Sequence, residues 1–125
     1  MHTLSFIVLL VMAGNAEAAS DGFSKEKCPS GVSIVGAGPP KGLERHCARS
    51  NGQKDGPEAI WYPNKRVKEH GYWREGQKTG LWESWYENGE HKSSCEFQSG
   101  REDGLCQTWF PTGSLQNSAN FRGGL

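Results

Sequence analysis

Long apolar runs are rare in this sequence of 125 residues. The longest, residues 4–13, has about ten residues, whereas a helix that spans a bilayer needs about 20. It is followed by small residues and by Ala16-Glu17-Ala18, a triplet typical of a signal-peptide cleavage site. We therefore expect residues 1–18 to be a signal peptide that is cut near Ala18. The mature protein would then be secreted or periplasmic, with no integral membrane segment.

An excess of charge of one sign is also missing. The 14 basic and 14 acidic residues balance, and the basic ones form neither a stripe nor a cluster. Binding to nucleic acid depends on clustered Lys and Arg, and so does binding to an anionic membrane surface. Both are therefore poor candidates for a partner.

The sequence has four cysteines but no Cys-x-x-Cys spacing. In a short exported chain, an even number of cysteines favours disulfides. Of the three possible connectivities we favour the one with Cys28–Cys47, which closes a glycine- and proline-rich loop and stabilises the fold by roughly 3 kcal/mol. The second pair would be Cys95–Cys106, across a turn at Gly100 to Gly104.

A zinc site is the competing interpretation of these cysteines, with His46 beside Cys47 as ligands. Structural zinc sites usually use closely spaced cysteine pairs, which this chain lacks. We therefore predict neither a metal nor a cofactor.

What the sequence does have is a 24-residue repeat, in which Gly-x-x-x-Gly is followed by tryptophan and a second aromatic residue. Its three copies are Gly52, Gly56, Trp61 and Tyr62; Gly76, Gly80, Trp85 and Tyr86; and Gly100, Gly104, Trp109 and Phe110. One unit cannot bury its own apolar face, so stacked units share a core and form one long surface. We divide the mature chain into a cap, residues 19–46, and repeats over residues 47–125. The units are 47–70, 71–94, 95–118 and a partial unit, 119–125.

Each unit contains two stretches that suit β-strands. Residues 81–86 are rich in aromatics, and the Asn88-Gly89 step that follows is a strong hairpin signal because both residues tolerate positive φ. The return strand alternates small or aromatic residues with mostly polar ones, which is typical of a half-buried strand. We expect the chain to turn at its glycines, because they reach conformations that strain other residues. These are Gly52, Gly56, Gly76, Gly80, Gly89, Gly100, Gly104 and Gly113.

The pattern Gly76-x-x-x-Gly80-x-Trp82-x-x-Trp85-Tyr86-x-Asn88-Gly89 resembles the MORN-variant repeat family, the type often labelled as an antitoxin-like repeat. The resemblance extends from Cys47 to the C-terminus. It implies an all-β fold in which each unit is a hairpin and the hairpins form one elongated, twisted antiparallel sheet. The loop-rich N-terminal segment would cap the first edge of that sheet.

The units differ from one another at two places. Lys65 replaces the turn glycine found at Gly89, so the first turn would rely on Asn64. Glu58 and Cys106 stand where the second unit has Trp82, which would weaken the packing of the outer units.

Two aromatic columns run through the repeats, and these are our candidate binding residues. One contains Trp61, Trp85 and Trp109, and the other contains Tyr62, Tyr86 and Phe110. Neighbours in a strand point to opposite faces, so we predict an aromatic row on each face. One row would line the core, and the other would be partly exposed unless the N-terminal segment covers it. An exposed row could stack on sugar rings or anchor a protein partner; the alternative is that it is simply core.

No catalytic residues stand out. His46 and His70 are one repeat apart, in a column continued by Ser94 and Ser118, and could form a metal or proton-transfer site, or simply be solvated. Glu83, Glu87 and Glu90 could supply a carboxylate pair for sugar hydrolysis, although acidic residues on a strand and turn are usually only solvated. The serines have no triad partner, and the glycine pairs introduce no helix that could bind phosphate. We therefore expect a protein without enzymatic activity.

Two classes of function remain. The first is an exported scaffold for protein–protein interaction, which the repeat architecture favours; its more specific form is an immunity-like partner that neutralises a toxin. The second is a cell-wall or polysaccharide-binding module that uses the tryptophan row. The identity of the protein partner does not follow from the sequence.

Overall fold

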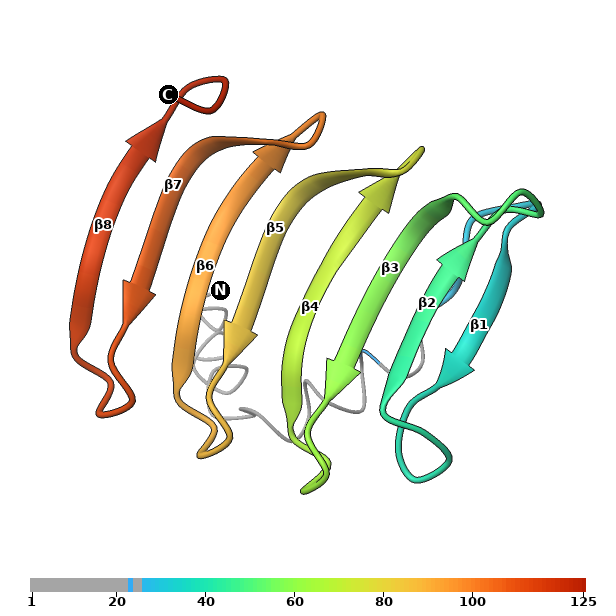
Figure 1. Cartoon of the computed structure of the whole chain (residues 1–125), viewed down its shortest axis with the longest axis horizontal. Coiled ribbons are helices and arrows are strands. Elements are labelled where there is room, and N and C mark those ends of the chain that lie inside the picture. The colour runs from blue at the N-terminus through green and yellow to red at the C-terminus, as the bar shows by residue number, and fades with distance from the viewer. Residues whose placement is uncertain (1–22, 24–25) are drawn as a thin grey trace, which may run out of the picture.

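The computed structural model describes residue 23 and residues 26–125, so the expected signal peptide lies outside the described residues. Eight strands pair antiparallel in chain order and form one open sheet, with β1 and β8 as its edges (Figure 1). They are β1 (Ser33–Ala37), β2 (Glu44–Ala48), β3 (Lys54–Trp61), β4 (Val67–Arg74), β5 (Gln77–Trp85), β6 (His91–Gln98), β7 (Arg101–Trp109) and β8 (Leu115–Phe121). Residues 26–125 contain no helix. The expected all-β hairpin sheet is therefore confirmed.

At one end of the strands, the β4–β5 and β6–β7 turns are tight two-residue turns. Glu75 and Gly76 both have positive φ (50° and 82°), and so do Ser99 and Gly100 (52° and 83°). Two successive positive φ values are typical of a type I′ β-turn, the mirror image of the type I turn, and its twist matches that of the strands. Only the second position of each turn is glycine, so the first residue is held in a conformation that is uncommon for its type.

At the opposite end of the strands the turns are longer, and their glycines Gly89 and Gly113 take φ values of 93° and 99°. At the matching position Lys65 itself adopts a φ of 73°. Asn64 supports this turn, because its Oδ1 accepts a hydrogen bond of 2.9 Å from the backbone N–H of Arg66. The first turn thus combines a side-chain hydrogen bond with a left-handed lysine.

Three of the expected turn glycines do not reverse the chain. Gly56, Gly80 and Gly104 lie inside β3, β5 and β7, although their φ values are positive (119°, 72° and 119°). The β6–β7 pairing is irregular beside Gly104. A glycine with positive φ permits such a bulge, which bends the strand instead of ending it. The turn prediction is therefore wrong at these three positions.

The strand register is the same in every hairpin from β3 onward. Trp61 opposes Val67, and the equivalent residues Trp85 and Trp109 oppose His91 and Leu115. The column of aromatics therefore lies beside a second column, Val67, His91 and Leu115, across each hairpin.

Strand β2 is shifted by one residue relative to this register. His46 opposes Glu58 of β3, whereas His70, one repeat later, opposes Glu83 and Ala59. A one-residue shift turns the side chains of a strand to the other face. His46 and His70 therefore lie on opposite faces of the sheet, and the expectation that they share a column is wrong.

Opposed residues share a face and successive residues alternate, so the pairings define two faces. The tryptophan face carries, among others, Trp61, Trp85, Trp109, His70, His91, Leu81 and Leu105. The disulfide face carries, among others, His46, Glu58, Trp73, Trp82, Phe97, Glu102 and the Cys95–Cys106 pair.

Both faces contribute to the core, which extends from β2 to β5. On the tryptophan face, Ala59 and Trp61 are each 2% exposed and cluster with Val67. On the disulfide face, Trp82 lies over Gly71, where an added Cβ would overlap the indole ring. Gly71 is therefore needed for close approach and not for its backbone conformation. Burial decreases toward β8, an edge strand without a charged residue.

The structure contains the disulfides Cys28–Cys47 and Cys95–Cys106, the connectivity that the sequence favours. The first ties the N-terminal segment to β2, with a Cα–Cα distance of 5.6 Å. The second joins directly opposed residues of β6 and β7, with a Cα–Cα distance of 4.0 Å. Two disulfides fit an oxidising, extracellular or periplasmic compartment.

Candidate functional site

The tryptophan face carries a continuous aromatic stack. His91 lies between the indoles of Trp85 and Trp109, with ring centroids 5.3 and 4.8 Å apart and interplanar angles of 7° and 14°. Its Nε2 lies 3.0 Å from Oε2 of Glu83, which fixes the orientation of the imidazole. The sequence-based candidates omit His91. Its position in the column opposite the tryptophans could have predicted the contact, because the Cβ atoms of opposed strand residues lie about 4.5–5.5 Å apart.

The N-terminal segment covers the other end of this row. The ring of Phe23 stacks on His70, with centroids 3.7 Å apart, and lies 6.2 Å from that of Trp85. Glu26 joins the same contact, because its Oε1 lies 2.8 Å from Nε2 of His70. Its backbone carbonyl also accepts a hydrogen bond from Arg45. The tryptophan face is thus covered over β4 and becomes more open toward β8.

Equivalent tryptophans consequently differ in environment. Trp61 is 2% exposed and belongs to the core, whereas Trp85 and Trp109 are half-buried. Three apolar residues of the same face are much more exposed: Tyr72 (41%), Leu81 (47%) and Leu105 (43%). Leu115, at the end of the tryptophan row, is 52% exposed.

The second predicted column connects neighbouring hairpins. The hydroxyls of Tyr62 and Tyr86 donate hydrogen bonds of 2.8 Å to the carbonyl oxygens of Trp85 and Trp109. Phe110 has no hydroxyl and is 45% exposed. Burial raises the pKa of the Tyr62 phenol, and the nearby Glu87 and Tyr86 raise it further.

The disulfide face has its own aromatic group, Trp73, Trp82 and Phe97. These residues are not among the candidate binding residues predicted from the sequence. Trp82 is 5% exposed and meets Trp73 edge to face, with centroids 5.3 Å apart. The ammonium of Lys78 lies 4.5 and 5.1 Å from the rings of Trp82 and Phe97. At the position equivalent to Trp82, the buried carboxylate of Glu58 accepts a hydrogen bond of 2.7 Å from Nε1 of Trp73.

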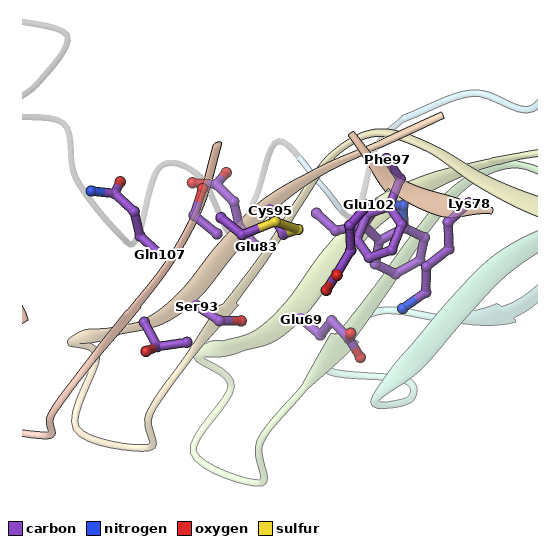
Figure 2. A pocket seen from close by; sticks show the side chains of 12 residues that line it. Glu69, Lys78, Glu83, Ser93, Cys95, Phe97, Glu102 and Gln107 are labelled. Atoms are coloured by element: carbon purple, nitrogen blue, oxygen red, sulfur yellow. A yellow bond between two sulfur atoms is a disulfide. The ribbon is translucent and has the colours of Figure 1, made fainter. Parts of the chain in front are cut away.

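A shallow pocket of about 230 Å³ opens beside this group (Figure 2). Lys78, Phe97, Glu69 and Glu102 are among the residues that line it. Three carboxylates, Glu69, Glu83 and Glu102, line the pocket together with one ammonium, Lys78, beside the aromatic rings, so no single chemistry in it would select a ligand.

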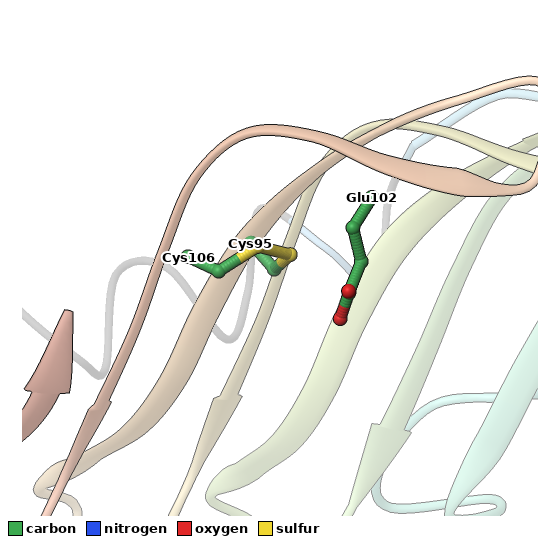
Figure 3. A group of neighbouring side chains, drawn as sticks. All are labelled: Cys95, Glu102 and Cys106. Atoms are coloured by element: carbon green, nitrogen blue, oxygen red, sulfur yellow. A yellow bond between two sulfur atoms is a disulfide. The ribbon is translucent and has the colours of Figure 1, made fainter. Parts of the chain in front are cut away.

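The disulfide forms one wall of this pocket. In Figure 3, Glu102 points beneath the arch of β7 on the side where the disulfide lies. Its carboxylate and the sulfurs of Cys95 and Cys106 lie within 4.8 Å of one another. While the sulfurs are bonded to each other they are not thiolates, the form that binds metals. This group is therefore a structural bridge.

The acidic residues singled out for sugar hydrolysis do not converge. Glu83 pairs with His91 on the tryptophan face, whereas Glu87 and Glu90 are exposed residues of the turn between β5 and β6. Across the strands of that face, His70 is paired with Ala59 on one side and with Glu83 on the other, and Glu83 is paired with Ser94.

The profile of a protein family described as MORN repeat variant matches residues 78–99. The matched segment begins in β5 and ends just after β6, so it corresponds to one hairpin of the sheet. This match supports the assignment of the β5–β6 hairpin to the MORN-variant repeats, a family of repeats and not of enzymes. No curated protein and no solved structure shows a significant match to the chain. In the described residues, no helix is both long and apolar enough to cross a membrane.

Proposed function

We propose that the protein is an exported scaffold that binds another protein through the open part of its tryptophan face. The observation that carries this proposal is the set of exposed apolar side chains on that face, Leu81, Leu105 and Leu115, the last of which directly opposes the half-buried Trp109. Large apolar side chains that remain exposed on a folded protein often mark interaction sites. MORN-variant repeats are interaction modules in general, which is compatible with this role.

The stacking geometry favours a protein over a polysaccharide. A sugar ring binds against the free face of an indole, but His91 covers one face of both Trp85 and Trp109. The ring of Phe23 also lies near Trp85, with centroids 6.2 Å apart. Aliphatic side chains such as Leu81 and Leu105 suit the apolar core of a protein interface. An immunity-like role, in which the bound protein is a toxin, is the more specific form of this proposal.

The test uses the exported protein as bait in an extract of the compartment into which it is secreted. Proteins retained by the wild type are identified and produced, and their affinity is measured by calorimetry. We expect the double variant Leu81→Glu/Leu105→Glu to lose the partner, because each new carboxylate would have to be desolvated in the interface. Thr108→Glu is the matched control, because it adds a charge at a half-buried site on the opposite face.

Two results would contradict the proposal. One is a partner that the double variant binds as well as the wild type does. The other is retention of the protein by peptidoglycan fragments, with loss of that retention in Trp109→Ala but not in the double variant. The second result would favour the polysaccharide-binding class instead.

A further inference from the structure

A second cluster of possible metal ligands lies on the disulfide face, in strands far from the exposed Leu105 and Leu115. It consists of Glu44 and His46 of β2 and Glu58 of β3. Glu44 and His46 are two residues apart in one strand and so point to the same face, and Glu58 directly opposes His46. One ligand atom from each of the three residues lies within 4.8 Å of the other two.

One atom in this cluster is a buried polar group without a partner, of the kind that a cation would satisfy, and a second member is a buried carboxylate. Nδ1 of His46 is buried and has no hydrogen-bond partner among the described residues. Glu58 is 5% exposed. A buried carboxylate needs compensation, and it has two partners: Nε1 of Trp73 at 2.7 Å and Nζ of Lys54 at 2.9 Å.

We propose that Glu44, His46 and Glu58 form a binding site for a zinc ion or a similar divalent transition metal. Imidazole nitrogen together with carboxylate oxygen suits zinc, whereas calcium and magnesium prefer oxygen ligands alone. In a four-coordinate zinc site the ligand atoms are about 3.3 Å apart, given bonds of about 2.0 Å. Because Glu44 is exposed, its side chain can move to close the difference.

The one-residue shift of β2 is what creates this cluster. In the regular register, a residue at the position of His46 lies on the tryptophan face, as His70 does. The shift places the imidazole opposite Glu58, the residue that replaces Trp82 in this unit. The hydrogen bond from Trp73 would orient the metal-bound carboxylate, as such bonds do in known sites.

Lys54 makes the proposal specific, because its ammonium competes with a metal for Oε2 of Glu58. The ammonium also lies 5.1 Å from the centroid of the Trp73 ring, so it has a second favourable contact when it leaves the carboxylate. Removal of the lysine charge should therefore tighten metal binding, which few substitutions outside this site would do.

Calorimetric titration of ZnCl₂ into the untagged protein tests the site. Both disulfides are kept intact, so that no thiolate contributes to binding. We expect one zinc ion per chain. Glu44→Gln should weaken the affinity at least about tenfold, since loss of an outer-shell partner alone costs 10- to 100-fold. Lys54→Gln should strengthen it.

His70→Gln is the matched control, because this histidine occupies the same repeat position on the other face and meets a single carboxylate, Glu26. We expect its zinc affinity to equal that of the wild type. The proposal is overturned if the wild type binds no stoichiometric zinc, or if Glu44→Gln leaves the affinity unchanged. Preference for CaCl₂ over ZnCl₂ would also overturn it. Glu44 is exposed, so its substitution leaves the fold intact and the result interpretable.

Discussion

The hydroxyl of Tyr62 donates a hydrogen bond to the carbonyl oxygen of Trp85, 2.8 Å away in the next hairpin. Tyr86 and Trp109 repeat this relationship one unit later. Asn64 and Asn88 add a second set of links, because each Nδ2 donates to a carbonyl oxygen of the following turn at 3.1 Å. Each hairpin is thus joined to the next by side-chain hydrogen bonds as well as by the strand ladder.

Removal of one of these links should destabilise the protein measurably. Tyr86→Phe deletes the hydroxyl and leaves the ring in place, so we expect the free energy of unfolding to fall by about 1 kcal/mol. Urea denaturation measures this change. Tyr72→Phe is the control, because the hydroxyl of Tyr72 has no hydrogen bond to another described residue. Equal effects of the two substitutions would show that the link between hairpins adds nothing.

Trp61 and Trp109 occupy the same position in their units but should respond differently to truncation. We expect Trp61→Ala to cost about 3–5 kcal/mol, because this indole is 2% exposed in the core. Trp109→Ala should cost clearly less, because the indole is already half-exposed to water in the folded state. Melting temperatures of the two variants give the comparison. Equal losses would mean that something covers the tryptophan face as far as β7.

The raised pKa of Tyr62 predicts a loss of stability at high pH. The fold favours the neutral phenol, so the contribution is fully present below the unfolded pKa of 10.0. It is lost as the pH rises from there through the raised pKa of the folded state. Urea denaturation of the wild type and Tyr62→Phe between pH 8 and roughly pH 11 should show the wild-type advantage shrinking with pH. An advantage that grows with pH would contradict this assignment.

The two disulfides should not be equivalent. By chain entropy alone each bridge contributes roughly 3 kcal/mol. The Cys28→Ala/Cys47→Ala variant should lose more than this, because Cys47 is fully buried and Gly56 and Pro29 pack around it. The Cys95→Ala/Cys106→Ala variant should lose less, because both residues are only half-buried. Denaturant midpoints compare them, and the reverse order would be inconsistent with the burial.

Much of the fold followed from the repeat, because glycine positions and strand-length aromatic runs are local signals. The hairpin sheet, its turns at Gly76, Gly89, Gly100 and Gly113, and the disulfide partners could all be anticipated. Gly56, Gly80 and Gly104 could not, since the same positive φ serves a turn or a bulge equally well.

The candidate sites were less predictable because they depend on contacts between distant segments. The stack of Phe23 on His70 joins residues far apart in the sequence, and no repeat pattern reports it. The shift of β2 is likewise invisible in the repeat spacing, which places His46 and His70 in one column. A shift of one residue changes no composition and no period, yet it exchanges the two faces.

Burial is concentrated in β2 to β5 and decreases toward both edge strands, so the sheet has a fixed inner part and looser edges. In a chain of units that contact only their neighbours, each unit opens with a free energy set by its own core and one or two interfaces. The disulfide to Cys47, the buried Trp61 and the contacts of Phe23 all act on the same few strands near the N-terminus. Strand β8 has a single neighbour and few buried side chains. Its amides should exchange with solvent early, so the strands that carry Leu105 and Leu115 are also among those that can bend to fit what they bind.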